Sequence, residues 1–409
     1  MTDNAFDILQ QRGFIAQVTD EAALRQLLAE ETITFYTGFD STADSLHAGS
    51  LVPIMAMMHL QRAGHRAIGL VGGGTTMVGD PSGRTELRQM LSPEKIQGFG
   101  RKIHAQLDRY LHFEEGQAIA ENNDRWLLDL NYVTFLREIG RHFSVNRMLA
   151  AEAYKQRLER GLSFIEFNYQ LLQAYDYLEL YRRYTCTLQM GGDDQWGNIL
   201  AGVDLIRRVE SVTVHALTYP LLTTSGGAKM GKTAAGAVWL DAAKTSPYDY
   251  YQYWINCDDR DVEKLLKIFT FLPLDEIARL SALSGAELRQ AKQVLAFEAT
   301  KISHGQAEAQ AAVEAAQAAF GHQGDLDGLP STVISQGRLA AGLGVLQIFV
   351  EVGLTQSRSE ARRLVEQGGV YVNDVRVTDI EASLTPADLT ADGIMLRAGK
   401  KKYHRLVVE

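Results

Sequence analysis

Cysteine is scarce in this sequence, and its scarcity excludes two kinds of structural cross-link. Cys186 and Cys257 are the only cysteines among 409 residues. Their separation fits neither a disulfide framework nor the paired spacing of a cysteine-built zinc site. Because two isolated thiols suit a reducing compartment, we expect a cytoplasmic protein.

Long hydrophobic runs are also missing. The nearest approach, residues 51–58, stops at His59 and falls far short of the roughly 20 residues of a membrane helix. The first seven residues carry Asp3 and Asp7 where a signal or transit peptide would carry bases. We therefore expect neither a membrane span nor a targeting segment.

Basic residues are not in excess either, because 41 Lys and Arg stand against 50 Asp and Glu, a net charge of −9. The acidic excess belongs to the first 340 residues, since residues 341–409 contain nine of each sign. A local basic face can bind phosphates even on an acidic protein. The net charge therefore does not exclude a nucleic-acid partner.

The first part of the chain shows the pattern of a parallel α/β sheet. A strand at residues 32–36 enters a turn at Gly38, a helix covers about 47–63, and a strand at 66–71 runs into three glycines. Such alternation predicts a doubly wound sheet, whose ligands bind at the carboxyl ends of the strands. Further helical pattern covers about 134–181, and another strand ends near Met190.

At 409 residues the chain is too long for one ordinary core, so we expect two or three domains. Residues 247–320 are helical in pattern, and the glycine-containing stretch at 321–331 is typical of a linker. A compact unit begins near Leu343.

Residues 226–233, Gly-Gly-Ala-Lys-Met-Gly-Lys-Thr, fit the phosphate-binding-loop pattern G-x-x-x-x-G-K-T. That loop needs a helix opening at the Lys-Thr pair, whereas Gly236 and a strand-like stretch at 238–240 follow here. The context therefore disfavours a phosphate-binding loop, and a solvated loop that carries two lysines is the other interpretation of these residues.

His47 precedes Gly49 at the start of a predicted helix. Free N–H groups and positive potential make a helix N-terminus an anion site, and histidine can donate to a phosphoryl oxygen. A histidine there can equally be a helix cap or fill the core. Its weight as a nucleotide ligand depends on the lysine loop later in the chain.

Tyr169, Gln173 and Asp176 fall at positions i, i+4 and i+7, on one face of a predicted helix. The residues around them are apolar or aromatic, so this polar stripe is expected to face inward. Buried polar groups need partners. Either a polar ligand or a buried structural network would supply them.

Arg358 and Arg362 share a helix face, with Arg363 beside them, and a hairpin about residues 373–374 follows. A helix-borne arginine cluster next to a small β unit suits an RNA phosphate backbone. A solvated basic face is the alternative.

Together these segments resemble the bacterial tyrosyl-tRNA synthetases, a family of class I aminoacyl-tRNA synthetases, over almost the whole chain. The matching segments are residues 36–47, 79–83, 142–146, 173–176, 191–198, 246–248, 251–252 and 254–256. The tail resembles a small RNA-binding module named after a ribosomal protein. The resemblance implies a ligase that forms tyrosyl-adenylate and pyrophosphate from L-tyrosine and ATP, and then transfers tyrosine to tRNA(Tyr).

The implied fold is α/β, with a Rossmann-like parallel-sheet catalytic domain, then an α-helical domain and a small α+β RNA-binding domain. The expected bounds are 1–225 for the catalytic domain, 226–322 for the signature loop and helical anticodon-side domain, 323–341 for a linker and 342–409 for the RNA-binding domain. A homodimer is implied, with its interface at about residues 131–164.

Site residues carry over position by position. The resemblance implies catalysis by His47, Lys229, Lys232 and Thr233; tyrosine binding by Tyr36, Asp80, Tyr169, Gln173, Asp176 and Gln195; ATP binding by Gly38, Asp40, His47, Gly49, Ser50, Gly192, Asp194 and Lys232; and RNA binding by Arg358, Arg362 and Arg363. Arg84 and Arg88 would join if their loop closes over the phosphates. Magnesium would accompany ATP without a metal site made by the protein, and no prosthetic group is implied.

Ser50 departs from the family pattern, which usually has a second histidine at this position. Serine can still donate a hydrogen bond, but its reach is shorter and it has no ring. Competing interpretations are an RNA-binding paralogue without aminoacylation, a P-loop nucleotidase and a related synthetase for tryptophan.

If the family assignment holds, Lys232→Ala lowers the rate of adenylate formation far more than the affinity for tyrosine. The reason is that a lysine contact to the departing pyrophosphate strengthens in the transition state. Pre-steady-state kinetics checks this prediction, and a burst of adenylate with wild-type amplitude and rate would remove Lys232 from the reaction.

Overall fold

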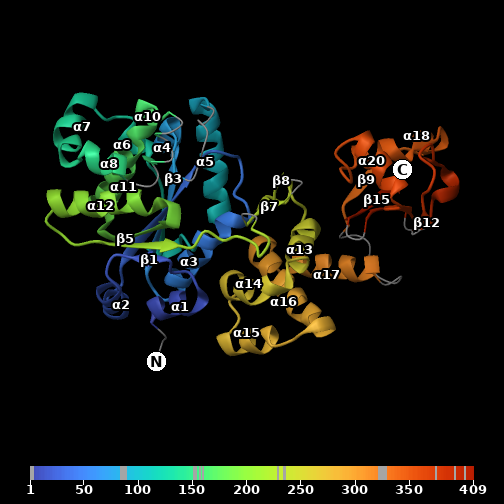
Figure 1. Cartoon of the computed structure of the whole chain (residues 1–409), viewed down its shortest axis with the longest axis horizontal. Coiled ribbons are helices and arrows are strands. Elements are labelled where there is room, and N and C mark those ends of the chain that lie inside the picture. The colour runs from blue at the N-terminus through green and yellow to red at the C-terminus, as the bar shows by residue number, and fades with distance from the viewer. Residues whose placement is uncertain are drawn as a thin grey trace. The chain divides into compact units, whose positions relative to one another are not determined.

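The computed structural model describes residues 4–82, 90–150, 154–155, 158, 161–227, 230–233, 236–320, 329–373, 375–390, 393–399 and 402–409. The chain forms two compact units, Met1–Lys244 with Asp258–Ala291, and Thr245–Cys257 with Lys292–Glu409. Figure 1 labels their helices and strands. The four-part division expected from the sequence stays a prediction.

The first unit is built on a six-stranded sheet. Its strands are β1 (Gln17–Val18), β2 (Thr34–Asp40), β3 (Arg66–Gly72), β4 (Ala118–Asn122), β5 (Cys186–Gly192) and β6 (His215–Tyr219). Their spatial order is β1-β6-β5-β2-β3-β4, and every neighbouring pair is parallel except β1 with β6. The winding therefore reverses between β2 and β5, and the predicted Rossmann-like α/β fold is confirmed.

Helices cover both faces of this sheet (Figure 1). The helices of the unit are α1 (Ala5–Arg12), α2 (Glu21–Glu30), α3 (Leu51–Arg62), α4 (Gly73–Val78), α5 (Pro93–Leu107), α6 (Asp124–Leu127), α7 (Tyr132–Glu138), α8 (Val145–Ala150), α10 (Phe164–Phe167), α11 (Tyr169–Tyr184), α12 (Trp196–Val209), α14 (Val262–Phe269) and α15 (Leu274–Ser281). In Figure 1 α3 and α5 lie on one side of the sheet, and α11 and α12 on the other. This double cover explains why β3 is buried along nearly its whole length.

Three local expectations needed correction. The strand predicted at 32–36 continues through Gly38 to Asp40. The helical stretch predicted at 134–181 is broken into α7, α8, α10 and α11, and the Ser163 hydroxyl caps a new start at α10. Of the three glycines at 72–74, Gly72 ends β3 and the other two begin α4, because the side-chain oxygens of Asn122 and Asn123 accept from the amides of Gly73 and Gly74 at 3.0 and 2.8 Å.

The lysine loop does not begin a helix. Lys232–Thr233 forms β7, which pairs antiparallel with β8 (Gly236–Ala237). A phosphate-binding loop would require helical backbone at this position, so the match to that pattern is one of sequence only.

The second unit contains most of α16 and the C-terminal elements. Its elements are α13 (Pro247–Ile255), α16 (Leu288–His304), α17 (Gln306–Phe320), β9 (Ser331–Ile334), α18 (Gln336–Ala340), β10 (Leu343–Gly344), α19 (Val345–Glu351), α20 (Arg358–Glu366), β11 (Val370–Val372), β12 (Val375–Arg376), β13 (Ser383–Leu384), β14 (Ile394–Ala398) and β15 (Lys402–Val408). Residues 331–334, expected in the linker, thus form β9, which pairs parallel with β15. The predicted hairpin about 373–374 is present as β11 and β12.

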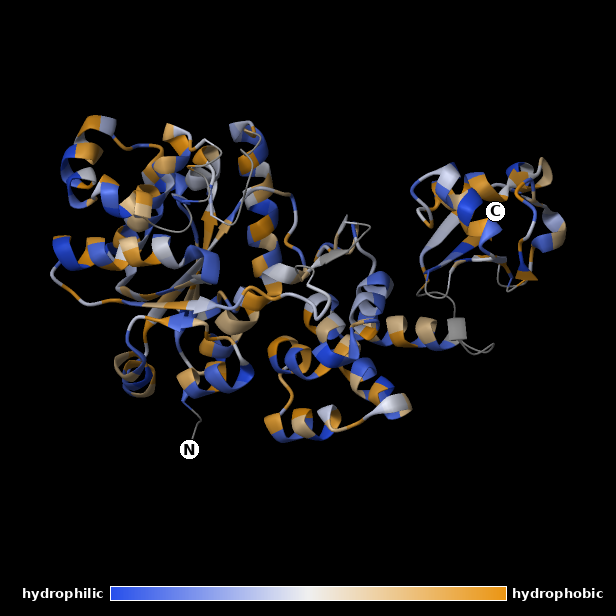
Figure 2. Cartoon of the chain, in the orientation of Figure 1, coloured by the Kyte–Doolittle hydropathy of each residue, from blue (hydrophilic) through white to orange (hydrophobic). Residues whose placement is uncertain are grey.

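Most helices of both units have one buried face. Figure 2 shows apolar and polar residues alternating around their turns, as amphipathic packing requires. Ile348, Phe349 and Leu396 are among the residues that form the core of the C-terminal sheet and its helices. Within the described ranges, no helix has both the length and the apolar character needed to cross a bilayer.

Candidate active site

A cavity of about 250 Å³ lies at the carboxyl ends of β5, β2 and β3, where the winding of the sheet reverses. Ligands of doubly wound sheets bind at such a point. All six predicted tyrosine-binding residues line the cavity, as do four of the predicted ATP-binding residues: Tyr36, Asp80, Tyr169, Gln173, Asp176 and Gln195, with Gly38, Asp40, Ser50 and Gly192. His47, Gly49 and Asp194 are not part of its lining.

Asp176, on the inward face of α11, is buried and held at both oxygens. The Trp126 indole N–H donates to its Oδ1 at 2.7 Å, and the Asn123 amide donates to its Oδ2 at 2.8 Å. These two donors come from the end of β4 and from α6. Neither was predicted from the sequence, where only the run of polar residues after β4 would have hinted at them.

The electrostatics of this end of the cavity follow from burial. Burial raises the pKa of Asp176 to about 8, although the hydrogen bonds from Asn123 and Trp126 oppose that shift. Burial, and then the charge of Asp176, raises the pKa of Tyr36 well above its ordinary value. Tyr36 therefore keeps its proton and is a hydrogen-bond donor at neutral pH.

Three polar atoms at this site are buried without a partner among the described residues. They are the Tyr36 hydroxyl, Gln173 Oε1 and Gln189 Oε1. Eighteen such atoms occur among the described residues, and these three belong to residues that line the cavity. A polar ligand would satisfy them, which favours a binding site over a closed structural network.

A second polar group surrounds Asp80, whose exposed fraction is 8%. Its Oδ2 accepts from Gln195 Nε2 at 2.7 Å, and its Oδ1 accepts from the Ser82 amide at 2.9 Å. Asn198 in turn donates to Gln195 Oε1 at 3.1 Å and so fixes the amide. The described structure thus gives Asp80 neutral partners, an arrangement suited to a cationic ligand group.

Asp40, at the end of β2, connects two neighbouring elements. Its Oδ1 accepts from the Thr75 hydroxyl at 3.0 Å, and its Oδ2 accepts from the Tyr169 hydroxyl at 3.4 Å. Thr75, at the start of α4, also lines the cavity and was missed from the sequence.

The two predicted signature segments are in direct contact. His47 caps the 3₁₀ turn η1 (Ala48–Ser50), and its Nδ1 accepts from the Gly49 amide at 3.0 Å. Gly231 has a φ of +79°, and a Cβ there would lie 2.5 Å from the Gly49 nitrogen. Only a residue without a side chain allows this approach.

The other predicted residues are placed as follows. Lys229, Arg84 and Arg88 lie outside the described residues, and the backbones of Lys232 and Thr233 lie in β7. Arg358, Arg362 and Arg363 of α20 line one groove of about 870 Å³ in the second unit.

Comparison with known proteins gives a consistent result along the chain. A family described as tRNA synthetases class I (W and Y) matches residues 28–321, and a second described as the tyrosine–tRNA ligase SYY-like C-terminal domain matches residues 322–406. A tyrosine–tRNA ligase of Clostridium botulinum (strain Loch Maree / Type A3) is 56% identical over 407 residues, 99% of this chain and 100% of the relative. The crystal structure of a C-terminally truncated mitochondrial tyrosyl-tRNA synthetase of Aspergillus nidulans is 31% identical with a TM-score of 0.69, covering 76% of this chain and 92% of the other.

The raised pKa of Asp176 predicts a pH-dependent stability that Asp176→Asn removes. The folded protein keeps this proton up to about pH 8, whereas the unfolded chain releases it near the ordinary aspartate pKa of 3.8. Rising pH therefore favours unfolding of the wild type, by up to about 1.4 kcal/mol per pH unit, and the uncharged variant lacks this loss.

Denaturant unfolding at several pH values between about 5 and 8 measures the effect. The free energy of unfolding of Asp176→Asn is expected to rise relative to wild type as the pH rises. Asp44→Asn is the control, because a hydrogen bond from Lys244 is the main cause that lowers the pKa of Asp44. A difference between wild type and Asp176→Asn that does not change with pH would contradict the assignment.

Proposed function

This chain belongs to the class I tyrosyl-tRNA synthetases and is a tyrosine–tRNA ligase, and we propose that the cavity at the β2–β5 reversal is where it activates tyrosine. The observation that supports this location is the set of buried polar atoms without partners in the cavity wall. The tyrosine carboxylate would attack the α-phosphorus of ATP, giving tyrosyl-adenylate and pyrophosphate. The tyrosyl group would then pass to the 3′-terminal adenosine of tRNA(Tyr).

The phenol end of the substrate is proposed to lie between Tyr36 and Asp176. Its hydroxyl would fill the hydrogen bond that the buried Tyr36 hydroxyl lacks and approach the Asp176 carboxyl group held by Asn123 and Trp126. Phenylalanine would leave these groups unpaired in a dry site, which costs more than the loss of one exposed hydrogen bond.

The ammonium end is proposed to pair with Asp80, with Tyr169 and Gln173 beside it. Asp80 is a nearly buried carboxylate with neutral hydrogen-bond donors, so an ammonium group would supply the missing opposite charge. Gln195, fixed by Asn198, would lie near the substrate carboxylate.

ATP is proposed to bind as its magnesium complex, with Gly38, Asp40, Gly192 and Asp194 on the adenosine side. The tyrosine carboxylate is already a nucleophile, so catalysis consists of positioning and of stabilising charge on the departing pyrophosphate. Because His47 Nδ1 accepts from the Gly49 amide, the neutral ring carries its proton on Nε2 and can donate it to a phosphate oxygen. Lys229, Lys232 and Thr233 would complete this end, with Gly49 and Ser50 at the helix start.

The groove lined by Arg358, Arg362 and Arg363 is proposed to bind the tRNA backbone. Three guanidinium groups on one helix provide multiple hydrogen bonds to phosphate oxygens. With these substrates, we place the protein in the cytoplasm, where tRNA is charged.

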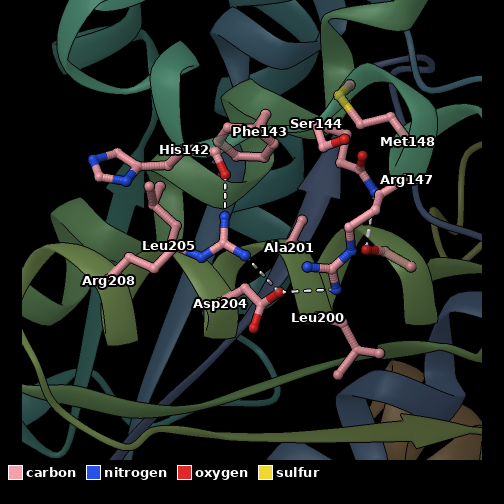
Figure 3. A pocket seen from close by; sticks show the side chains of 12 residues that line it. His142, Phe143, Ser144, Arg147, Met148, Leu200, Ala201, Asp204, Leu205 and Arg208 are labelled. Carbon is pink, nitrogen blue, oxygen red and sulfur yellow. Dashed lines mark hydrogen bonds and ion pairs between the residues drawn. The ribbon is translucent and has the colours of Figure 1, made fainter.

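We also propose that the protein is a homodimer, with its interface around residues 131–164. Large apolar side chains are exposed here, among them Val133 at 73% and Phe164 at 71%. Such a concentration marks an interaction surface more often than a free one. Residues of this segment also line a pocket of about 180 Å³. There the guanidinium groups of Arg147 and Arg208 lie on opposite sides of the Asp204 carboxylate, at 3.3 and 3.6 Å (Figure 3).

Val133→Asp is expected to make the protein monomeric, because burying a carboxylate in an apolar interface is strongly unfavourable. Sedimentation velocity measures the mass against the 45.3 kDa of one chain. The matched control is Val375→Asp in the second unit, where Val375 is equally exposed at 70%. A dimer that survives Val133→Asp at micromolar concentration would exclude this surface.

The activity itself is tested by pyrophosphate exchange into ATP. Exchange is expected with L-tyrosine and absent with L-tryptophan or L-phenylalanine. A silent assay with tyrosine would leave only an RNA-binding role, and exchange with tryptophan would assign the other substrate of the family. In the same assay Asp176→Ala is expected to reduce the preference for tyrosine over phenylalanine, and unchanged selectivity would remove Asp176 from the hydroxyl site.

A further inference from the structure

The segment that follows the signature hairpin runs antiparallel to the segment that carries His47. The Ala48 amide donates to the Val238 carbonyl at 2.8 Å, and the Leu240 amide donates to the Leu46 carbonyl at 2.9 Å. Between these bonds, His47 and Trp239 form an antiparallel bridge. The backbone therefore places the side chains of these two residues next to each other, independently of what those side chains are.

The Trp239 ring lies against the His47 ring in an edge arrangement. Their centroids are 6.4 Å apart and their planes are inclined by 65°, within the range of favourable aromatic pairs. The imidazole is thus limited on two sides, by the Gly49 amide at Nδ1 and by the indole. Together they restrict the rotation that would turn Nε2 away from its direction in the site.

The Trp239 indole is itself held in place by other residues. The Lys244 ammonium lies 5.1 Å from the centre of the Trp239 ring, within cation–π distance. Lys244 is held in turn by the Asp44 carboxylate at 2.5 Å, and Asp44 also pairs with Lys102 at 3.2 Å. Asp44, Lys244 and Trp239 form a row of contacts that ends on His47.

The beginning of the loop is anchored by different residues. Asp261, with an exposed fraction of 5%, accepts from the Ser225 amide at 2.8 Å. Lys264 donates to the Thr223 carbonyl at 2.9 Å. The start of the loop is thus held by Asp261 and Lys264, and Trp239, beyond the hairpin, packs against the His47 ring.

We propose that Trp239 is a positioning residue for His47 in adenylate formation, and that Lys244 and Asp44 hold the indole in place. The proposal rests on the role assigned to His47 under the proposed function. Trp239 is not among the residues that line the tyrosine cavity, so its effect is on the orientation of the imidazole towards the phosphates and not on tyrosine binding.

The test measures the single-turnover rate of tyrosyl-adenylate formation together with the dissociation constant for tyrosine. Trp239→Leu is expected to lower the rate by about 2- to 12-fold with an unchanged dissociation constant for tyrosine. Trp239→Phe, which keeps an aromatic ring beside His47, is expected to retain most of the wild-type rate. Lys244→Gln is expected to lower the rate by about 2- to 5-fold. Lys102→Gln is the matched control, because Lys102 pairs with the same Asp44 but is not in contact with the indole, and it is expected to leave the rate unchanged.

A double-mutant cycle with His47→Asn separates the possible outcomes. If Trp239 acts through His47, Trp239→Leu has little further effect in the His47→Asn background. Equal losses in both backgrounds, a loss of tyrosine affinity, or equal effects of the two lysine substitutions would overturn the proposal. If His47→Asn alone leaves the rate of adenylate formation unchanged, His47 has no role in the reaction. That result would contradict the proposed function and not the positioning role of Trp239.

Discussion

The buried carboxyl group of Asp176 is the constraint on which the geometry of the cavity at the β2–β5 reversal depends. A carboxyl group removed from water is stable only when its oxygens are hydrogen-bonded, and here Trp126 and Asn123 donate to one oxygen each. Those two donors require the end of β4 and the short α6 to lie against α11. Tyr36 of β2 lines the same cavity, so the shape of the cavity and the local fold depend on a single cluster.

Helical periodicity predicted one part of the cavity wall, and the family resemblance supplied the other candidate residues. The spacing of Tyr169, Gln173 and Asp176 was sufficient to put them on one face of α11, and the structure places all three in the cavity wall. The donors to Asp176 could not be found in this way. They lie about fifty residues away in the chain, and no periodicity relates a side chain to a partner on a different element.

In the fold, too, local sequence patterns predicted some features, and contacts between distant residues determined others. The alternation of strands and helices was readable, but the breaks between α7, α8 and α10 depend on individual caps such as Ser163, which a general helical pattern does not reveal. The resemblance of residues 226–233 to a phosphate-binding loop also reflects this limit. The spacing of glycine and lysine shows only which residue types the segment contains. Pairing with β8 determines that the backbone of Lys232 and Thr233 is a strand and not the start of a helix.

The close approach of Gly49 and Gly231 joins two segments that lie far apart in the chain. A methyl group on Gly231 would meet the backbone of the other segment at 2.5 Å, so neither strand of the contact can yield by moving a flexible side chain. A side chain at position 231 would therefore push the two segments apart. The position of the His47 ring relative to the hairpin thus depends on the smallest residue in the loop.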